Sequence, residues 1–305
     1  MKVLFATDGS KEDLEARSFV AGACWPAGTE IELLGVMRPV AIAVSGTIVD
    51  RDLGEFERQL QSLATSLPRR DCVVTWHAAV GHPAEAIAAR ARAIEADLIV
   101  VGSRRRGPIA SSLLGSVSAG VIDRAPCPVL VARHAQTERI VFADDGSAGA
   151  ATAGAFVDRW PIFGEVAVQV VTVVDIGRPL SIPDAPLIYS AGERLYLDTL
   201  DEERAHAKEI AEARINAIRT GPRTLKTSLR EGDAAEEILD AARAFAADLI
   251  VMGSRGQTGV VRFFAGSVAR RVLLEAKCSV LIARGTAKIV HDSEPVRPFP
   301  ALVLA

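Results

Sequence analysis

Two glycine-containing segments, each directly after an apolar run, have the residue types that bind anions. The first reads GSRRRGPIASSLLGSV from Gly102 to Val117 and follows ADLIVV; the second reads GSRGQTGVVRFFAGSV from Gly253 to Val268 and follows ADLIVM. Glycine admits positive φ angles and lets the backbone approach a ligand without an intervening Cβ. A helix that follows would add free N–H groups and a dipole that favours negative charge. Each segment is therefore a candidate phosphate site.

A structural explanation of the same glycines stays open, because they also suit a surface loop that leads into a helix. Paired glycines by themselves are a weak signal. The preceding apolar run, the expected helix start near Ser116 or Ser267, and the recurrence of the arrangement favour the phosphate site. The Ser267 hydroxyl suits either a helix cap or a phosphate contact.

The glycine segments belong to two copies of one longer unit. VLFATDGS near the start of the chain matches IVFADDGS in the second half, and GHPAEAI matches GDAAEEI further along each copy. The GHPAEAI and GDAAEEI motifs lie further apart in the chain than VLFATDGS and IVFADDGS do. The second copy therefore carries an insertion, at about 175–200. We expect one domain at 1–134, a second at 138–285 and a C-terminal tail at 286–305.

Short β-rich runs alternate with amphipathic stretches in each copy. In PAEAIAARARAIEA and similar stretches, apolar residues recur at the spacing of a helix. The predicted strands of the first copy are Lys2–Thr7, Glu30–Met37, Cys72–Val80, Asp97–Gly102 and Cys127–Arg133. Such alternation predicts a parallel sheet covered on both faces. We therefore expect an α/β fold of two tandem doubly wound parallel-sheet domains, whose ligands bind beyond the carboxyl ends of the strands.

The composition narrows the classes of partner. A net charge of −3 and an aromatic content of 5% argue against nucleic acid. No stretch approaches the roughly 18 apolar residues of a membrane span, so no membrane partner is expected. The opening MKVLFATDGS becomes acidic too soon for a signal peptide, and we expect a cytoplasmic protein.

Residues for catalysis or metal binding are not grouped in the sequence. The four cysteines form no CxxC pair or Cys/His cluster, and the five histidines are scattered. No Walker lysine follows the glycines, and no GxGxxG follows the first predicted strand. We therefore predict no catalytic residue and no metal ligand.

The chain resembles the universal stress protein family. Its glycine segments are similar to the family's ATP-binding signature of Gly, two residues, Gly, nine residues, Gly and Ser or Thr, and Gly253, Gly256, Gly266 and Ser267 match it in full. The ATDGS, ADDGS, GDAAEEI and CPVLVAR segments also resemble the family. The resemblance covers nearly all of both copies. It implies Rossmann-like domains of the adenine nucleotide alpha hydrolase-like type.

The resemblance also implies that ATP, with or without Mg²⁺, is the ligand. In the second copy the adenosine end would fall on Asp145 and Val173, and the phosphates on Gly253, Arg255, Gly256, Gly266, Ser267 and Val268. The matching positions of the first copy are Asp8, Val36, Gly102, Gly115 and Ser116.

Arg105 departs from the signature, because it stands where the family has its second glycine. A left-handed backbone there would cost roughly 1 kcal/mol or more, and the side chain would also fill space meant for phosphate. Against this, a guanidinium beside a triphosphate supplies a fork of donors. ATP binding by the first copy therefore stays open, whereas the second copy has the intact signature.

The function implied by the resemblance is that of an ATP-binding, nucleotide-dependent stress-response regulator with an unidentified protein partner. Two alternatives stay open: an interaction scaffold that binds no nucleotide, and a slow ATPase. The last strands, CPVLVAR and CSVLIAR, are expected to lie side by side, so that the two copies form a pseudo-dimer within one chain. A homodimer of whole chains is compatible with the same sequence.

Overall fold

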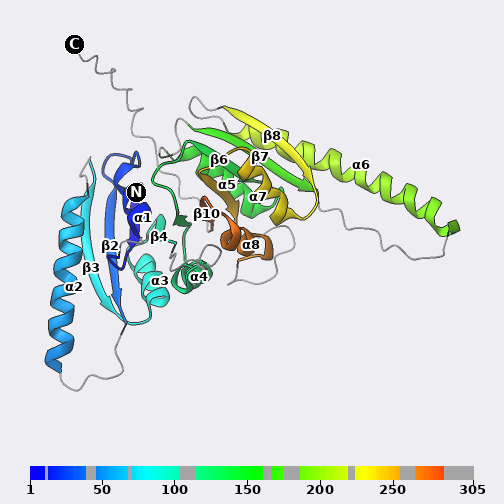
Figure 1. The fold of residues 1–305 in the computed structure, drawn as a ribbon. Helices are drawn as coiled ribbons and strands as arrows, with labels where there is room; N and C mark the ends of the chain where they lie inside the picture. Colours follow the sequence, from blue (N-terminus) through cyan, green and yellow to red (C-terminus); the bar gives the residue numbers. More distant parts are fainter. Residues whose placement is uncertain are drawn as a thin grey trace, which may run out of the picture.

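The two halves of the chain share one continuous sheet of ten strands in the order β3-β2-β1-β4-β5-β10-β9-β6-β7-β8 (Figure 1). The computed structural model describes residues 1–10, 13–38, 46–67, 71–103, 114–160, 162, 166–174, 186–218, 224–254 and 265–284. All strand pairs within each half are parallel. Among the strands that the structure describes, only the pair at the centre of the sheet, β5 with β10, is antiparallel.

The first half alternates strands and helices as the sequence predicts. Its elements are β1 (Lys2–Ala6), α1 (Leu14–Gly22), β2 (Glu30–Met37), α2 (Gly46–Ser66), β3 (Val73–Val80), α3 (Pro83–Ala93), β4 (Leu98–Gly102), α4 (Ser116–Arg124) and β5 (Val129–Ala132). The chain order reverses between β1 and β4, which lie side by side. This is the switch point at which doubly wound sheets bind ligands.

The second half repeats this order. Its elements are β6 (Arg139–Ala143), α5 (Ala148–Arg159), β7 (Ala167–Val174), α6 (Pro186–Ala217), β8 (Leu225–Glu231), α7 (Ala234–Ala244), β9 (Leu249–Gly253), α8 (Ser267–Glu275) and β10 (Ser279–Ala283). The corresponding switch point lies between β6 and β9. The longer second copy is visible in α6, which has 32 residues where α2 has 21.

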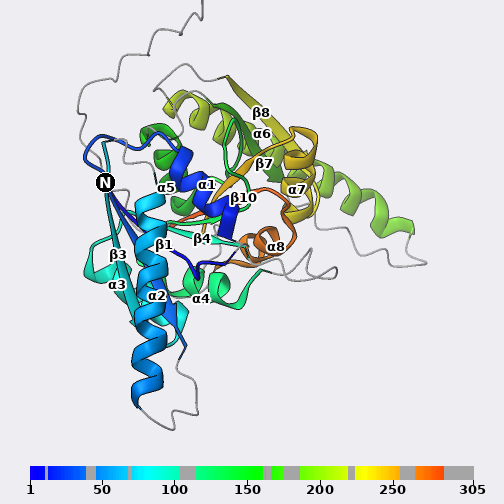
Figure 2. The ribbon, with the colours of Figure 1, turned by 60° about the vertical axis from the view of Figure 1, so that its left-hand side comes forward.

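Helices cover both faces of the sheet, and each face has one apolar layer that runs through both halves. One layer joins α3, α4, α7 and α8 to the sheet through residues such as Ile87, Val121, Ile238 and Val272. The other layer joins α1, α2, α5 and α6, and the rotated view brings α1 and α2 to the front (Figure 2). Strands buried on both sides are therefore almost continuously apolar, as in the LIVV and LIVM runs.

The two halves meet along the antiparallel pair β5 and β10. Val131 faces Val280, and Leu130 faces Leu281, with all four side chains buried. This confirms the prediction that the last strands of the two copies lie side by side. Apolar burial at the centre of the sheet therefore stabilises the contact between the two halves.

Two corresponding arginines extend this contact beyond the strands. Arg133, directly after β5, donates to the Leu273 carbonyl at 2.7 Å and the Cys278 carbonyl at 3.0 Å in the other half. Arg284, directly after β10, donates to the carbonyls of Asp123 at 3.0 Å and Ala125 at 3.3 Å. Each arginine thus meets carbonyl groups at or just beyond the end of the partner half's last helix, where a cation is favoured.

The fold predicted from the sequence is confirmed, and the predicted strand limits agree within one or two residues. Cys127 and Cys278 are buried apolar residues, and burial raises the pKa of the Cys278 thiol to about 11. Of the predicted insertion, residues 175–185 lie outside the described residues, as does the predicted tail at 286–305. Among the described residues, no helix has the length and apolar character that a membrane crossing needs.

We predict that Arg133→Ala and Arg284→Ala each lower the free energy of unfolding by about 2 kcal/mol. Each change leaves two carbonyl groups without a charged donor and removes the packing of a long side chain. Urea unfolding followed by circular dichroism measures the effect. Arg270→Ala, at an exposed position of α8, is the control and should change the value by no more than about 0.5 kcal/mol. Equal stabilities for all three variants would contradict a role for the two arginines.

Candidate functional site

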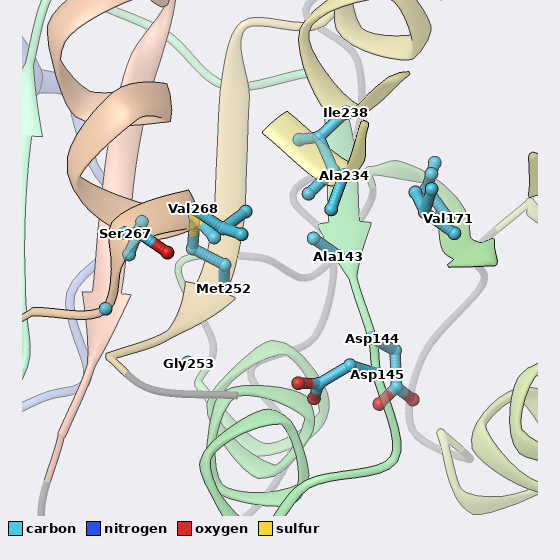
Figure 3. Close-up of a pocket in the computed structure, with 13 residues that line it drawn as sticks. Ala143, Asp144, Asp145, Val171, Ala234, Ile238, Met252, Gly253, Ser267 and Val268 are labelled. Carbon is cyan, nitrogen blue, oxygen red and sulfur yellow. The ribbon is translucent and has the colours of Figure 1, made fainter. Parts of the chain in front are cut away.

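Most of the predicted phosphate-binding residues of the second half line one pocket. This pocket lies beyond the carboxyl ends of β6 and β9 (Figure 3). The pocket has a volume of about 190 Å³. The residues that line it are Ala143, Asp144, Asp145, Val171, Val173, Ala234, Ile238, Met252, Gly253, Gly266, Ser267, Val268 and Ala269. These come from three strands and from the starts of α7 and α8.

The acidic end of the pocket comes from the two residues after β6, whose carboxylates point in different directions (Figure 3). Asp145 accepts a hydrogen bond from the Ser147 N–H at 3.0 Å, which forms an Asx turn into α5. Asp144 is buried, and its carboxylate forms an ion pair with Arg214 of α6, whose Nε lies 2.6 Å from Oδ2. The Arg214 guanidinium also lies over the Phe142 ring at 5.7 Å. The Asp144 charge is therefore neutralised inside the protein.

The end of the pocket at the start of α8, which favours anions, is set by hydrogen bonds at both ends of the glycine segment. The Gly266 N–H donates to the Ser254 carbonyl at 2.8 Å, and the Ser254 N–H donates to the Ala283 carbonyl of β10 at 3.0 Å. The chain therefore leaves and rejoins the sheet edge at one place. Gly266 is the N-cap of α8 and has no side chain with which to cap it. The first N–H groups of α8 thus face the pocket without a side-chain acceptor from the N-cap residue.

Ser267 is the first residue of α8 rather than its cap. Its side chain is exposed, and Figure 3 shows its hydroxyl turned toward the middle of the pocket. Of the two uses that the sequence leaves open for this hydroxyl, the helix cap is therefore not the one observed. The position remains suited to an anionic ligand at the helix start.

Gly253 has a structural role that the sequence motif does not reveal. A Cβ at this position would lie 2.6 Å from the Gly149 carbonyl carbon and 2.9 Å from the Ala150 nitrogen at the start of α5. These are backbone atoms, which cannot rotate away. The first glycine of the segment therefore lets α5 cross close to the end of β9, whether or not a ligand binds there.

The opposite wall of the pocket is apolar. Val171 and Val173 of β7 and Ile238 of α7 form it, whereas Met252 lies beside Val268 (Figure 3). The start of α7 is fixed by Asp233, which accepts a hydrogen bond from the Glu236 N–H at 2.9 Å. An apolar wall opposite a helix start suits a ligand with one flat apolar part and one anionic part.

The first half has a corresponding but smaller pocket, with a volume of about 60 Å³. The residues that line it are Ala6, Thr7, Asp8, Asp13, Leu34, Val36, Pro83, Ile87, Val101, Gly102, Gly115, Val117 and Ser118. Asp8 forms the same Asx turn as Asp145, because its carboxylate accepts the Ser10 N–H at 3.1 Å. The backbone frame of the two sites is thus alike.

Asp13 distinguishes the first pocket from the second. Its side chain is 7% exposed, and its Oδ2 accepts the Thr7 hydroxyl at 2.7 Å and the Asp8 N–H at 3.0 Å. Its Oδ1 lies 2.5 Å from the point where Gly102 would carry a Cβ. Burial raises the pKa of the Asp13 carboxyl to about 6, the Thr7 hydrogen bond opposes this shift, and the Asp8 charge adds to it.

The structure brings together most of the predicted site residues. Those that line the second pocket are Asp145, Val173, Gly253, Gly266, Ser267 and Val268, and those that line the first are Asp8, Val36, Gly102 and Gly115. Ser116 is exposed at the start of α4, beside the first pocket. Arg105, Arg255 and Gly256 lie outside the described residues.

Sequence reasoning missed two features of the sites. The Asp13 carboxylate in the first pocket was hidden among charged residues of a predicted helix. The pair of Asp144 with Arg214 joins residues that are distant in the chain, and no local spacing indicates it. A position-by-position alignment of the two copies, which sets Asp13 against Ala150, could have found the first. Among the described residues, no group of His, Cys, Asp and Glu is arranged to hold a metal ion.

Comparison with known proteins gives one consistent family. The model of the universal stress protein family matches residues 1–133 and again residues 136–284. A universal stress protein of Thermus aquaticus is 32% identical over 137 residues, which are 43% of this chain and 97% of that protein. One of Mycobacterium tuberculosis is 30% identical over 200 residues, which are 62% of each chain.

A solved structure shares the fold of this chain over nearly its whole length. The crystal structure of a universal stress protein from Archaeoglobus fulgidus superposes with a TM-score of 0.67 at 19% identity. The match covers 94% of this chain and 98% of that chain. At this identity the comparison shows a common fold.

We predict that Gly253→Ala lowers the free energy of unfolding by about 1–3 kcal/mol, because the new methyl group would overlap the backbone at the start of α5. Gly54→Ala is the matched control. A Cβ at Gly54, inside α2, meets no atom within 4 Å, and this change should stabilise the protein by up to about 1 kcal/mol. Thermal and urea unfolding of both variants measure the difference. A Gly253→Ala variant as stable as the wild type would contradict the close approach.

We also predict a pH-dependent cost of the Asp13 charge. The folded-state pKa of about 6 lies above the ordinary value of 3.8, so the folded protein holds the proton more tightly than the unfolded chain. The resulting stabilisation is fully present below pH 3.8 and is lost as the pH rises to about 6; the full difference is roughly 3 kcal/mol. Relative to wild type, Asp13→Asn should therefore gain stability between pH 4 and pH 7. A pH-independent difference between the two proteins would exclude this titration.

Proposed function

Because the chain belongs to the universal stress protein family, we propose that its second half binds ATP in the pocket between β6 and β9. We further propose that this binding makes the protein a nucleotide-dependent regulator of a stress response. The observation that carries the proposal is the pocket itself, with the start of α8 at one end and an apolar wall at the other. Such a pocket suits the phosphates and the base of one nucleotide.

The phosphate end would use backbone groups more than side chains. Gly266 and Ser267 are at the start of α8, where N–H groups and the helix dipole favour an anion. The Ser267 hydroxyl would add one donor. Arg255 and Gly256, between the two fixed ends of the segment, are the expected remaining contacts. The Mg²⁺ that commonly accompanies ATP would be held mainly by the nucleotide.

The adenosine end would use Asp145 and Val173. Asp145 lines the pocket at the end of β6, and a carboxylate in this place can accept hydrogen bonds from ribose hydroxyls. Val173 lies at the carboxyl end of β7 and is part of the apolar wall. Neutralisation of the neighbouring Asp144 by Arg214 supports the proposal, because it leaves one net negative charge rather than two beside the ligand.

The regulatory part of the proposal follows from the position of the glycine segment. Ser254 and Gly266 fix its two ends to the sheet, and a ligand would contact the residues between them. If the surface that these residues present has two arrangements, ATP shifts the equilibrium between them by no more than the difference in its binding free energy for the two. A partner that reads this surface would therefore sense the nucleotide. Hydrolysis is not required for such a device.

We predict that Gly266→Leu abolishes nucleotide binding by the second half while the fold survives. The φ angle at Gly266 is −61°, which any residue adopts, so leucine adds bulk at the helix start without backbone strain. Gly115→Leu is the matched control, because Gly115 has φ −59° at the corresponding position of the first half. The measurement is the nucleotide released from denatured protein and the ATP bound in equilibrium dialysis with Mg²⁺.

About one ATP per wild-type chain, lost in Gly266→Leu and kept in Gly115→Leu, is the expected result. Release of ADP instead of ATP after incubation would point to the slow ATPase. A wild-type protein that carries no nucleotide and takes up none at millimolar ATP would contradict the proposal and favour the scaffold. Retained binding in Gly266→Leu would mean that the nucleotide site lies elsewhere.

A further inference from the structure

The two pockets differ at one position where both helices approach the end of a central strand. Counting from the matching DGS motifs, Asp13 of the first half corresponds to Ala150 of the second. Both positions contact the glycine that ends the neighbouring strand: Asp13 contacts Gly102, and the Ala150 nitrogen contacts Gly253. In the second half this contact is backbone against backbone. In the first half the contact with Gly102 is made by the Asp13 carboxylate.

The Asp13 carboxylate faces the space that corresponds to the helix-start end of the second pocket, where an anion is favoured. It lines the first pocket together with Gly102 and Gly115, whereas Ala150 is not among the residues that line the second. The first pocket is also the smaller, at about 60 Å³ against about 190 Å³. The side chain thus takes up part of the volume that is open in the other half.

No cation among the described residues neutralises Asp13. Its carboxylate accepts hydrogen bonds from the Thr7 hydroxyl and the Asp8 N–H, and the neighbouring charge that acts on it is the carboxylate of Asp8. The second half treats its own buried carboxylate differently, since Asp144 is paired with Arg214 at 2.6 Å. Asp144 corresponds to Thr7 of the first half. The buried acid therefore stands at a different position in each half, and it is paired with an arginine in the second half.

We propose that Asp13 excludes phosphorylated ligands from the pocket of the first half, so that the chain carries one nucleotide and carries it in the second half. The inference rests on the proposed function for its ligand class. A phosphate at the start of α4 would meet a buried, uncompensated carboxylate, and like charges in such surroundings repel strongly. The α4 N-terminus would otherwise be as suitable for an anion as that of α8.

The titration of Asp13 agrees with this role. With a pKa near 6 the carboxyl is mostly ionised at neutral pH, although it is buried. An approaching phosphate would raise that pKa further, because a second negative charge disfavours the ionised form. Binding of ATP to the first half would therefore require the uptake of a proton or the displacement of the side chain. Each of these lowers the affinity.

The experiment measures ATP binding by the first pocket alone, because Gly266→Leu removes binding by the second. Equilibrium dialysis with labelled ATP and Mg²⁺ at pH 7.5 compares the full-length Gly266→Leu protein with the double variant Gly266→Leu, Asp13→Ala. The double variant should gain about one ATP per chain, with an affinity at least tenfold above that of Gly266→Leu alone. Asp13→Asn in the same background, which keeps the size of the side chain and removes its charge, should also raise the affinity. If neither change raises ATP binding, Asp13 is not the barrier and the inference is overturned.

A reciprocal exchange tests the same barrier in the second half. Ala150→Asp should weaken ATP binding at least tenfold more than Ala150→Asn, which adds a side chain of similar size without charge. Circular dichroism checks that both variants fold. Equal affinities of the two Ala150 variants, or two ATP bound per wild-type chain, would also overturn the inference.

The two proposals fail in different ways. If the wild-type chain binds no ATP but the Asp13→Ala, Gly266→Leu variant binds one, the proposed function of the second half fails while the role of Asp13 stands. If the wild-type chain binds one ATP and Asp13→Ala adds none, the function stands and the role of Asp13 fails.

Discussion

The antiparallel pairing of β5 with β10 is the contact on which the rest of the molecule depends. It joins two five-stranded parallel sheets into one, and the apolar layers on both faces then run through both halves without a break. Because the strands of the two halves run in opposite directions, their carboxyl ends face opposite edges of the sheet. Arg133 and Arg284 add the same contact twice, each reaching the end of the other half's last helix. The chain has the symmetry of a dimer without being one.

Covalent linkage frees such a pair from the requirement that both sites be alike. In a dimer of identical chains, a change in one pocket is a change in both. Here the two halves keep the same Asx turn and a glycine N-cap at the helix start. The strand-end glycines differ, because backbone atoms of α5 approach Gly253 whereas the Asp13 carboxylate approaches Gly102. Within this common frame, Asp13 replaces alanine in one half, and the acid paired with Arg214 is present only in the other. The two pockets therefore share a backbone frame and differ in single charged side chains.

Much of the structure followed from local pattern. The strands and helices of the first half were predictable from apolar spacing, and the pairing of the last strands followed from the resemblance of both copies to one family. The glycine segments were placed correctly at the ends of β4 and β9. Their meaning was only partly predictable, since Gly253 is needed by the packing of α5 as well as by any ligand. A glycine of a predicted ligand-binding motif thus also has a packing role, and the sequence alone does not separate the packing role from the binding role.

The sequence by itself determined the duplication, the α/β fold and the edge of the sheet at which each site lies, because these depend on periodic apolar burial and on turn residues that act locally. Only the tertiary structure decided which carboxylates beside the two pockets are paired with a cation. Asp144 meets Arg214 across 70 residues of chain, and Asp13 turns into a pocket beside Gly102. Burial and pairing of a charge depend on atoms brought together by folding, so the electrostatic difference between the two pockets is a property of the packed molecule and not of either motif.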